Sequence, residues 1–280
     1  MAPVRESDDA RYTWESVAPA WERHRERMFE STRAVSEWLV ERLDPHEGDF
    51  VLELTSGPGE TGFLAAERLG PKGRLICTDL APGMVDVARR GAAARGLENV
   101  DFEVVDAQQI DLADRSVDGV LSRFGLMLVP DPVQAFAEIR RVLRPGGRLA
   151  YGVWGPPERN AWIGLLMGAL IQNGHAPPGD PFAPGGVLSL APAGRNRELL
   201  AGAGFDEVTV TDVCGAMRFA DLDDYWSVQT SVAGPVASLV AGMTDDQVAA
   251  VRETLEPDMA PFRDDDGYAL PSLATVVTAT

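Results

Sequence analysis

The fold of this chain is decided by residues 50–62, which read Phe50-Val51-Leu52-Glu53-Leu54-Thr55-Ser56-Gly57-Pro58-Gly59-Glu60-Thr61-Gly62. An apolar run of strand character ends there at a glycine-rich turn, and residues 63–69 have the spacing of an amphipathic helix. Gly57, Gly59 and Gly62 match the pattern G-x-G-x-x-G, which indicates a dinucleotide site on a first reading. The stretch therefore predicts a strand, a loop and a helix, with a loop that a ligand approaches closely.

The regions on either side continue this alternation. Further strands are expected at residues 73–79, 99–105, 116–122 and 148–154, with helices at residues 82–95 and 131–143 and a turn at 144–147. This rhythm predicts an α/β fold, with a parallel sheet covered on both faces and ligands bound beyond the carboxyl ends of the strands.

The two ends of the chain are expected to add helices. Residues 14–43 have helical spacing, and Pro19 and the pair Ser31-Thr32 are expected to divide them into two or more helices. After the core we expect a helix at 160–172, a Pro- and Gly-rich loop at 174–194, a helix at 195–203, a strand at 206–213, two or three helices in 221–255 and an antiparallel strand at 268–278. The predicted domains are a helical arm or lid (1–45), an α/β core (46–213) with a flap (174–194), a helical cap (214–266) and a strand that returns to the core (267–280).

The length and the net charge of the chain limit the kinds of molecule that it is expected to bind. The 280 residues are enough to bury a sizeable core, and the formal net charge of −18 argues against nucleic acid or an anionic membrane as the main partner. The first ten residues lack the apolar core of a signal peptide, and no apolar run is long enough to span a bilayer. We therefore expect a cytoplasmic protein, in which Cys77 and Cys214 are buried thiols.

The loop chemistry separates two adenosine cofactors. Asp79 lies 20 residues after Gly59, where an acid can hold ribose hydroxyls in either case. A pyrophosphate needs free backbone N–H groups, whereas Pro58 lacks one and the strand ends carry the acids Glu53, Asp79 and Asp106. S-adenosylmethionine carries a sulfonium, an ammonium and one carboxylate, so these acids suit it better.

Four motifs then carry a family resemblance. Residues 53–59, Asp79, the pair Asp106-Ala107 and residues 141–149 resemble, in order, the motifs of class I S-adenosylmethionine-dependent methyltransferases. The resemblance covers about residues 50–154 and is nearest to the small-molecule enzymes of ubiquinone and menaquinone biosynthesis. It implies a Rossmann-like, doubly wound and mostly parallel seven-stranded sheet, with an N-terminal helical arm, a C-terminal helical cap and S-adenosyl-L-methionine as cofactor.

The resemblance also implies roles for single residues. The cofactor-binding residues would be Gly57 and Gly59 beside the amino-acid arm, Glu53 near its ammonium group, Asp79 on the ribose hydroxyls, Leu80 and Met84 on the adenine, Asp106 and Ala107 at the adenine edge, and Ser122 after the fourth strand. Thr55 stands where the family usually has glycine. A β-branched residue adopts φ > 0 with difficulty, so we expect the first turn of this loop not to use that conformation.

Methyl transfer from a sulfonium needs alignment and exclusion of water more than it needs acid or base. The candidate catalytic residues are Arg123, which follows the fourth strand, and His24 and His175, which could act as bases from the arm and the flap. No metal is expected. The residues Trp154, Trp162, Met167, Tyr225, Trp226 and Met243 either line a pocket for a small, apolar, aromatic or polyketide-like acceptor or pack the cap.

The sequence thus predicts an S-adenosylmethionine-dependent methyltransferase with a small-molecule acceptor. Two alternatives stay open: an enzyme of the same fold that catalyses a rearrangement or cyclisation without methyl transfer, and a non-catalytic binding protein. The oligomeric state and the acceptor atom are not predicted.

Overall fold

The computed structural model describes residues 6–192 and 194–280. Their strands form one sheet in the order β3-β2-β1-β4-β5-β8-β6, and the short β7 (Arg263–Asp264) pairs with β8. The parallel strands are β3 (Val100–Val104), β2 (Arg74–Asp79), β1 (Phe50–Glu53), β4 (Val117–Arg123) and β5 (Leu143–Trp154). β8 (Gly267–Ala279) runs antiparallel to β5 and to β6 (Thr209–Phe219). The expected mostly parallel seven-stranded sheet and the antiparallel last strand are confirmed.

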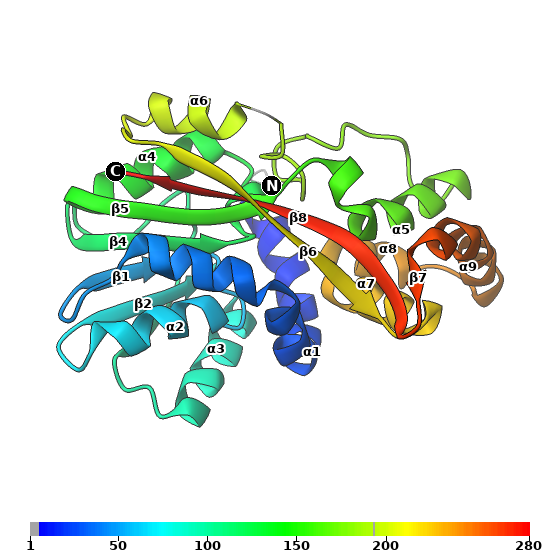
Figure 1. Ribbon diagram of the computed structural model, residues 1–280, viewed down its shortest axis with the longest axis horizontal. Helices are drawn as coiled ribbons and strands as arrows, with labels where there is room; N and C mark the ends of the chain where they lie inside the picture. Colours follow the sequence, from blue (N-terminus) through cyan, green and yellow to red (C-terminus); the bar gives the residue numbers. More distant parts are fainter. Residues whose placement is uncertain (1–5, 193) are drawn as a thin grey trace, which may run out of the picture.

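Helices cover both faces of the sheet (Figure 1). α1 (Glu6–Leu43), α2 (Glu60–Leu69) and α3 (Pro82–Arg95) pack against one another, while α4 (Pro132–Val142) packs against α6 (Arg195–Gly202) on the other side. The chain order explains this division. Each step from β1 to β2 and from β2 to β3 moves toward one edge of the sheet, and the step from β4 to β5 moves toward the other edge. Because such connections are right-handed, α2 and α3 lie on one face and α4 lies on the opposite face. The reversal lies between β1 and β4, where such sheets bind ligands.

A second group of helices lies beyond the carboxyl end of β5. The long β6 and β8 strands extend past the rest of the sheet, and α5 (Ala161–Gln172), α7 (Leu222–Val232), α8 (Gly234–Val240) and α9 (Asp245–Met259) gather around their far half (Figure 1). Short 3-10 turns are η1 (Leu126–Leu128), η2 (Pro157–Arg159) and η3 (Ala260–Phe262).

α1 is one helix of 38 residues, so the expectation that Pro19 and Ser31-Thr32 divide it is wrong. Pro19 is exposed while its neighbours Ala18 and Ala20 are buried, and the packing of the flanking residues outweighs the lost backbone hydrogen bond. The hydroxyls of Ser31 and Thr32 donate to carbonyls one turn earlier, at Arg27 and Met28, and are thereby satisfied within the helix.

Two other boundaries differ from expectation, and the loop expected at 174–194 agrees with the structure. β5 begins at Leu143, and the expected turn at 144–147 forms a bulge where the pairing with β4 shifts register. β6 starts later than expected and continues to Phe219, because all of it pairs with β8. The segment 174–194 has no helix or strand at its described positions, and Ser189 near its end donates to the carbonyl of Met127 at 2.5 Å.

Two further expectations concern single side chains and the membrane. Cys77 is buried, as expected, whereas Cys214 is exposed on β6, so the expectation for Cys214 is wrong. No helix in the described part of the chain combines the length and the apolar character that crossing a bilayer requires.

Candidate functional site

The loop between β1 and α2 has a left-handed backbone at three positions. The φ angles of Thr55, Gly57 and Gly59 are 54°, 53° and 83°. The expectation that Thr55 avoids a positive φ is therefore wrong. Its Oγ1 lies 2.5 Å from the carbonyl oxygen of Leu54 and 2.8 Å from Oγ of Ser122. These hydrogen bonds offset a conformational cost of roughly 1–2 kcal/mol for a residue with a Cβ.

Gly57 and Gly59 differ in what surrounds them. A Cβ on Gly57 would meet no atom within 4 Å, so bare backbone faces open space there. A Cβ on Gly59 would lie 2.6 Å from the ring of Phe63, so Gly59 is required by packing within the protein. Gly57 is thus the position where a ligand can approach the loop backbone most closely.

Glu53 lies beneath this loop and not on its surface. Its side chain is 1% exposed, and its Oε1 accepts a hydrogen bond from the backbone N–H of Gly62 at 2.9 Å. Burial raises the pKa of Glu53 to about 8. A Cβ on Gly62 would overlap the carboxylate, so the third glycine of the motif makes room for Glu53. The direct role of Glu53 in this structure is to hold the loop against the start of α2.

Asp79, at the end of β2, is oriented by backbone groups. Its Oδ2 accepts from the N–H of Gly57 at 2.9 Å and its Oδ1 accepts from the N–H of Ala81 at 3.0 Å. Burial raises its pKa although these bonds oppose the shift. Because each carboxylate oxygen can accept a second bond, Asp79 retains acceptor capacity beside the open backbone of Gly57.

The expected adenine-binding residues follow β2 and β3. Asp106 accepts from the backbone N–H of Gln108 at 2.9 Å and from its side-chain amide at 3.1 Å, and Ala107 beside it is buried. Leu80 is half-buried. Met84 is buried in a cluster with Val17 and Ala18 of α1, so the N-terminal half of α1 covers this side of the site.

The N-terminal half of α1 is fixed at several points. Glu15 accepts from the N–H of Gly83 at 2.7 Å, in the first turn of α3. Trp21 donates its indole N–H to the carbonyl of Val232 at 3.0 Å, and Arg27 donates to both oxygens of Asp224 at the start of α7. α1 therefore links the half of the sheet that carries Asp79 to the helices beyond β5.

Ser122 and Arg123 close β4 and have different surroundings. Ser122 is fully buried against Thr55. Arg123 is half-buried, with Nε donating to Oγ1 of Thr61 at 2.8 Å and Nη1 donating to Oγ1 of Thr32 at 2.6 Å. Burial lowers the pKa of its guanidinium. The sequence alone did not single out Thr32 or Thr61, because Thr32 is 91 residues away on α1 and neither is charged.

A row of aromatic rings begins beside Arg123. The Arg123 guanidinium lies 5.5 Å from the ring centre of Phe124, which itself has a φ of 60°. Phe124 stacks on Trp154 at 3.8 Å, and Trp154 meets Trp162 edge to face at 4.9 Å. The buried indole N–H of Trp162 has no acceptor among the described residues. At the carboxyl ends of β4 and β5, Trp154 and Trp162 are thus buried in the core, and Phe124 is the half-buried ring of the row.

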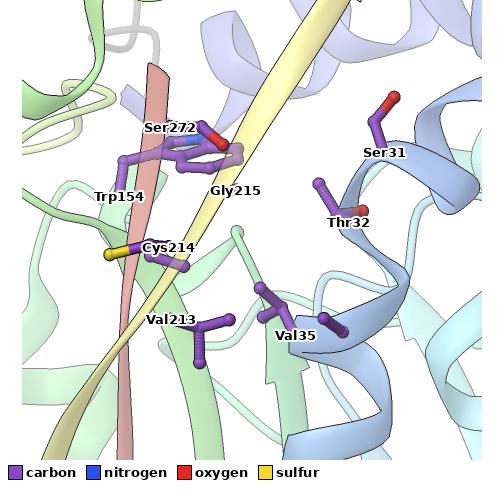
Figure 2. A pocket seen from close by; sticks show the side chains of 10 residues that line it. Ser31, Thr32, Val35, Trp154, Val213, Cys214, Gly215 and Ser272 are labelled. Atoms are coloured by element: carbon purple, nitrogen blue, oxygen red, sulfur yellow. The ribbon is translucent and has the colours of Figure 1, made fainter.

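A narrow cleft of about 30 Å³ lies next to this row, between α1 and the β6–β8 pair. Figure 2 shows Ser31 and Thr32 on α1 across the cleft from Trp154 and Ser272, and Val213 pointing from β6 toward α1. This volume holds about one water molecule. Any larger ligand that uses the cleft has to separate α1 from the β6–β8 pair.

The candidate bases His24 and His175 lie on α1 and just after α5. His24 is half-buried on α1, and burial lowers its pKa, with Arg23 and Arg27 acting in the same direction. His175 is half-buried just after α5. In the described part of the chain, no hydrogen bond joins either imidazole to Arg123, Asp79 or the loop. The same residues contain no cluster of His, Cys, Asp or Glu that could hold a metal ion.

Several of the expected acceptor residues pack the cap instead of facing the strand ends. Tyr225 is fully buried, donates its hydroxyl to the carbonyl of Trp162 at 2.9 Å and packs edge to face on Phe219. Trp226 is partly buried and lies under Arg252, and Met167 is 36% exposed. Trp154 and Trp162 are the two of this set that belong to the aromatic row.

Comparison with known proteins gives a consistent assignment. The family model for a methyltransferase domain matches residues 51–147. Nocamycin O-methyltransferase of Saccharothrix syringae is 30% identical over 231 residues, which are 81% of this chain and 79% of that protein. Aklanonic acid methyltransferase DauC of Streptomyces sp. (strain C5) is 38% identical over 40% of this chain and 51% of its own length. Arsenite methyltransferase of Halobacterium salinarum is 42% identical over 37% of this chain, which spans only 26% of that relative.

Solved structures share the fold. The YcgJ protein of Bacillus subtilis aligns with a TM-score of 0.59 at 16% identity, covering 88% of this chain and 97% of that one. The [4+2]-cyclase SpnF aligns with a TM-score of 0.54 at 21% identity, covering 88% of this chain and 80% of that one. The fold alone therefore does not distinguish methyl transfer from cyclisation. The sequence relatives, the motif order and the sheet topology together place this chain in the class I S-adenosylmethionine-dependent methyltransferases, whose cofactor is S-adenosylmethionine.

Proposed function

We propose that this protein transfers the methyl group of S-adenosylmethionine to a small, largely apolar acceptor. The observation that carries the proposal is the pairing of a buried carboxylate with open backbone: Asp79 accepts from the N–H of Gly57, and no protein atom would contact a Cβ on Gly57. Such a cradle suits an adenosine derivative that carries no phosphate, because Asp79 has spare acceptor capacity and its carboxylate already accepts from the N–H groups of Gly57 and Ala81.

The proposed cofactor contacts follow the strand ends in order. Asp79 would accept the ribose hydroxyls, and Gly57 and Gly59 would lie along the amino-acid arm. Leu80 and Met84 would pack on the adenine, with Asp106 and Ala107 at its polar edge. Glu53 acts through the loop, because its carboxyl is bonded to Gly62, and Ser122 acts through Thr55.

When bound, S-adenosylmethionine supplies an electrophilic methyl group on a sulfonium. The protein's own contribution is to align the acceptor with that methyl and to exclude water, and effective concentration of this kind is worth up to roughly 7–11 kcal/mol. The left-handed Thr55 and Phe124 fix the ends of the loop and of β4, between which the acceptor has to be held. Reaction in line with the sulfur–carbon bond is part of this proposal.

The proposed acceptor surface begins at the half-buried ring of Phe124, which stacks on the buried Trp154. An aromatic or polyketide-like body fits such a surface by stacking. The relatives named for nocamycin and aklanonic acid act on small molecules, which supports a small-molecule acceptor for this chain as well. A nucleic acid is a poor candidate for a protein with a net charge of −18.

Incubation with methyl-labelled S-adenosylmethionine and a panel of phenols, quinols, amines and aromatic acids tests the proposal. Label should pass to at least one acceptor, and S-adenosylhomocysteine should accumulate in equal amount. Tight binding of S-adenosylhomocysteine with no transfer to any acceptor would favour the cyclase or binding-protein alternatives. Absence of binding would reject the cofactor assignment for the whole protein.

A further inference from the structure

Arg123 has hydrogen-bonding capacity that the protein does not use. A guanidinium carries five N–H donors, and in Arg123 one on Nε and one on Nη1 are bonded, to Thr61 and Thr32. The remaining donors, including both on Nη2, have no partner among the described residues. The Nη2 edge of the guanidinium is therefore free to donate to an anion, whereas Nε already donates to Thr61.

The charge of Arg123 is also unbalanced. Two acids, Glu53 and Glu60, act on the Arg123 charge through space and raise its pKa, but neither forms an ion pair with it. Glu53 is bonded to Gly62, and because burial raises its pKa to about 8 it is largely neutral at pH 7. Glu60 is already paired with Arg25 and Arg95. A half-buried cation without a counter-ion costs free energy that an incoming anion would recover.

Several arginines of the sheet and its helices have carboxylate partners, whereas others without such a partner, such as Arg74 and Arg140, donate to backbone carbonyls. The carboxylate pairs include Arg27 with Asp224, Arg141 with Glu138, Arg144 with Asp118 and Arg148 with Asp44. Arg123 differs from them in its place at the end of β4, next to the aromatic row.

The two threonines hold the guanidinium in one orientation. The hydroxyl of Thr32 donates to the carbonyl of Met28 at 2.8 Å, so its oxygen is left to accept from Arg123. Oγ1 of Thr61 lies 2.9 Å from Oγ of Ser36 and also accepts from Arg123. Thr32 lines the cleft as well, so it connects the guanidinium with the space between α1 and the β6–β8 pair.

We propose that the free edge of Arg123 binds a carboxylate of the acceptor, so that this protein methylates aromatic or polyketide-like acids. The proposal rests on the proposed methyl transfer and names its substrate class. The acid group would lie against Arg123 and the apolar body against the half-buried ring of Phe124, while α1 keeps the bond between Thr32 and Arg123.

The chemistry of such an acceptor does not require either candidate histidine, His24 or His175, to act as a base. A carboxylate is already deprotonated at neutral pH, so no proton has to be removed. One carboxylate oxygen forms a new bond to the methyl carbon as the sulfur–carbon bond breaks, and the electron pair of that bond stays on sulfur. The products are a neutral methyl ester and S-adenosylhomocysteine, and the ester has lost the charge that held the acid to Arg123.

Calorimetry with benzoate and its neutral isostere benzamide tests this assignment on the protein saturated with S-adenosylhomocysteine. Wild type should bind benzoate at least about tenfold more tightly than benzamide, which corresponds to about 1.4 kcal/mol. Arg123→Gln should abolish this preference and leave the affinity for S-adenosylhomocysteine within about threefold. Arg148→Gln, which removes a surface arginine paired with Asp44, is the matched control and should keep the preference.

A second variant guards against misfolding of Arg123→Gln. Thr32→Val keeps the shape and the charge but removes one hydroxyl that aims the guanidinium, and it should reduce the preference for benzoate severalfold. The proposal is overturned if wild type shows no preference or no saturable binding, or if the preference persists in Arg123→Gln. It is also overturned if Arg123→Gln weakens S-adenosylhomocysteine tenfold or more, since Arg123 would then hold the carboxylate of the cofactor. Failure of wild type to bind S-adenosylhomocysteine would instead reject the proposed function, and benzoate binding could still be measured on the free protein.

Discussion

The hydroxyl of Thr55 lies 2.8 Å from the hydroxyl of Ser122, which ties the glycine loop to the end of β4. A Cβ on Gly125, three residues after Ser122, would overlap the side chain of Thr55. Thr55 therefore occupies space that Gly125 leaves open, and each of the two residues restricts what the other can be.

This relationship predicts a compensating pair of substitutions. Gly125→Ala should destabilise the protein by about 1–3 kcal/mol through overpacking against Thr55. Thr55→Gly should change stability by less, because the relief of the left-handed backbone and the loss of the bond to Ser122 act in opposite directions. The double variant should be more stable than Gly125→Ala alone. Urea unfolding of all four proteins measures the coupling, and strictly additive effects would show that the two side chains do not compete for space.

Gly57 and Gly59 are predicted to respond differently to alanine. Gly57→Ala places a methyl group in open space at a φ of 53°, so it should cost about 1–2 kcal/mol of stability but weaken S-adenosylhomocysteine roughly 100-fold. Gly59→Ala collides with Phe63 and should mainly lower the melting temperature. Calorimetry and thermal unfolding of both variants check this division. Unchanged affinity in Gly57→Ala would mean that the cofactor does not approach this backbone.

Asp79→Asn is predicted to separate the two roles of the Asp79 carboxylate, which are to accept from the loop backbone and to bind the ribose hydroxyls with a negative charge. The amide can still accept from the N–H of Gly57 or Ala81 but brings no charge to its hydrogen bonds. We expect the affinity for S-adenosylhomocysteine to fall about 10- to 100-fold, since bonds to a charged group contribute about 1.5–3 kcal/mol. Asp106→Asn is the comparison at the adenine edge. If only Asp106→Asn lowered the affinity for S-adenosylhomocysteine, the ribose would not bind at Asp79 on β2.

Glu53 is predicted to make stability depend on pH. Burial raises its pKa to about 8 from an ordinary value of 4.5, so between these values the folded protein holds a proton that the unfolded chain releases. Its contribution is fully present below pH 4.5 and is lost as the pH rises to about 8, at a rate of at most roughly 1.4 kcal/mol per pH unit. Glu53→Gln, which can still accept from Gly62 but does not titrate, should flatten the dependence. Unfolding free energies measured from pH 5 to 8 give the comparison, and parallel curves would mean that Glu53 is ionised in the folded state.

The parts of the fold that the sequence predicted are those with local signals. α3 runs from Pro82 to Arg95 as expected, because proline suits its first turn and Gly96 ends it with a φ of 68°. The glycine loop after β1 and the acids Asp79 and Asp106 after β2 and β3 were recognisable for the same reason. In each case the residue type at one position indicates a backbone conformation or a ligand contact.

The parts that the sequence did not predict depend on contacts between distant segments. The continuity of α1 through Pro19 comes from packing, and the full length of β6 comes from its pairing with β8. The left-handed Thr55 needs Ser122, and the partners of Arg123 come from α1 and α2. None of these relationships has a pattern within a short window of sequence, so pattern and propensity alone favoured other outcomes.

The unbroken α1 also has a kinetic consequence. Over its 38 residues, it covers Met84 at one side of the candidate site and borders the narrow cleft through Thr32 at the other. Because one helix makes both contacts, a movement of α1 that opens one side changes its contacts on the other, so exchange of the two proposed ligands should not be independent. Steady-state turnover is then expected to follow a compulsory order, with the cofactor bound first under α1 and S-adenosylhomocysteine leaving last.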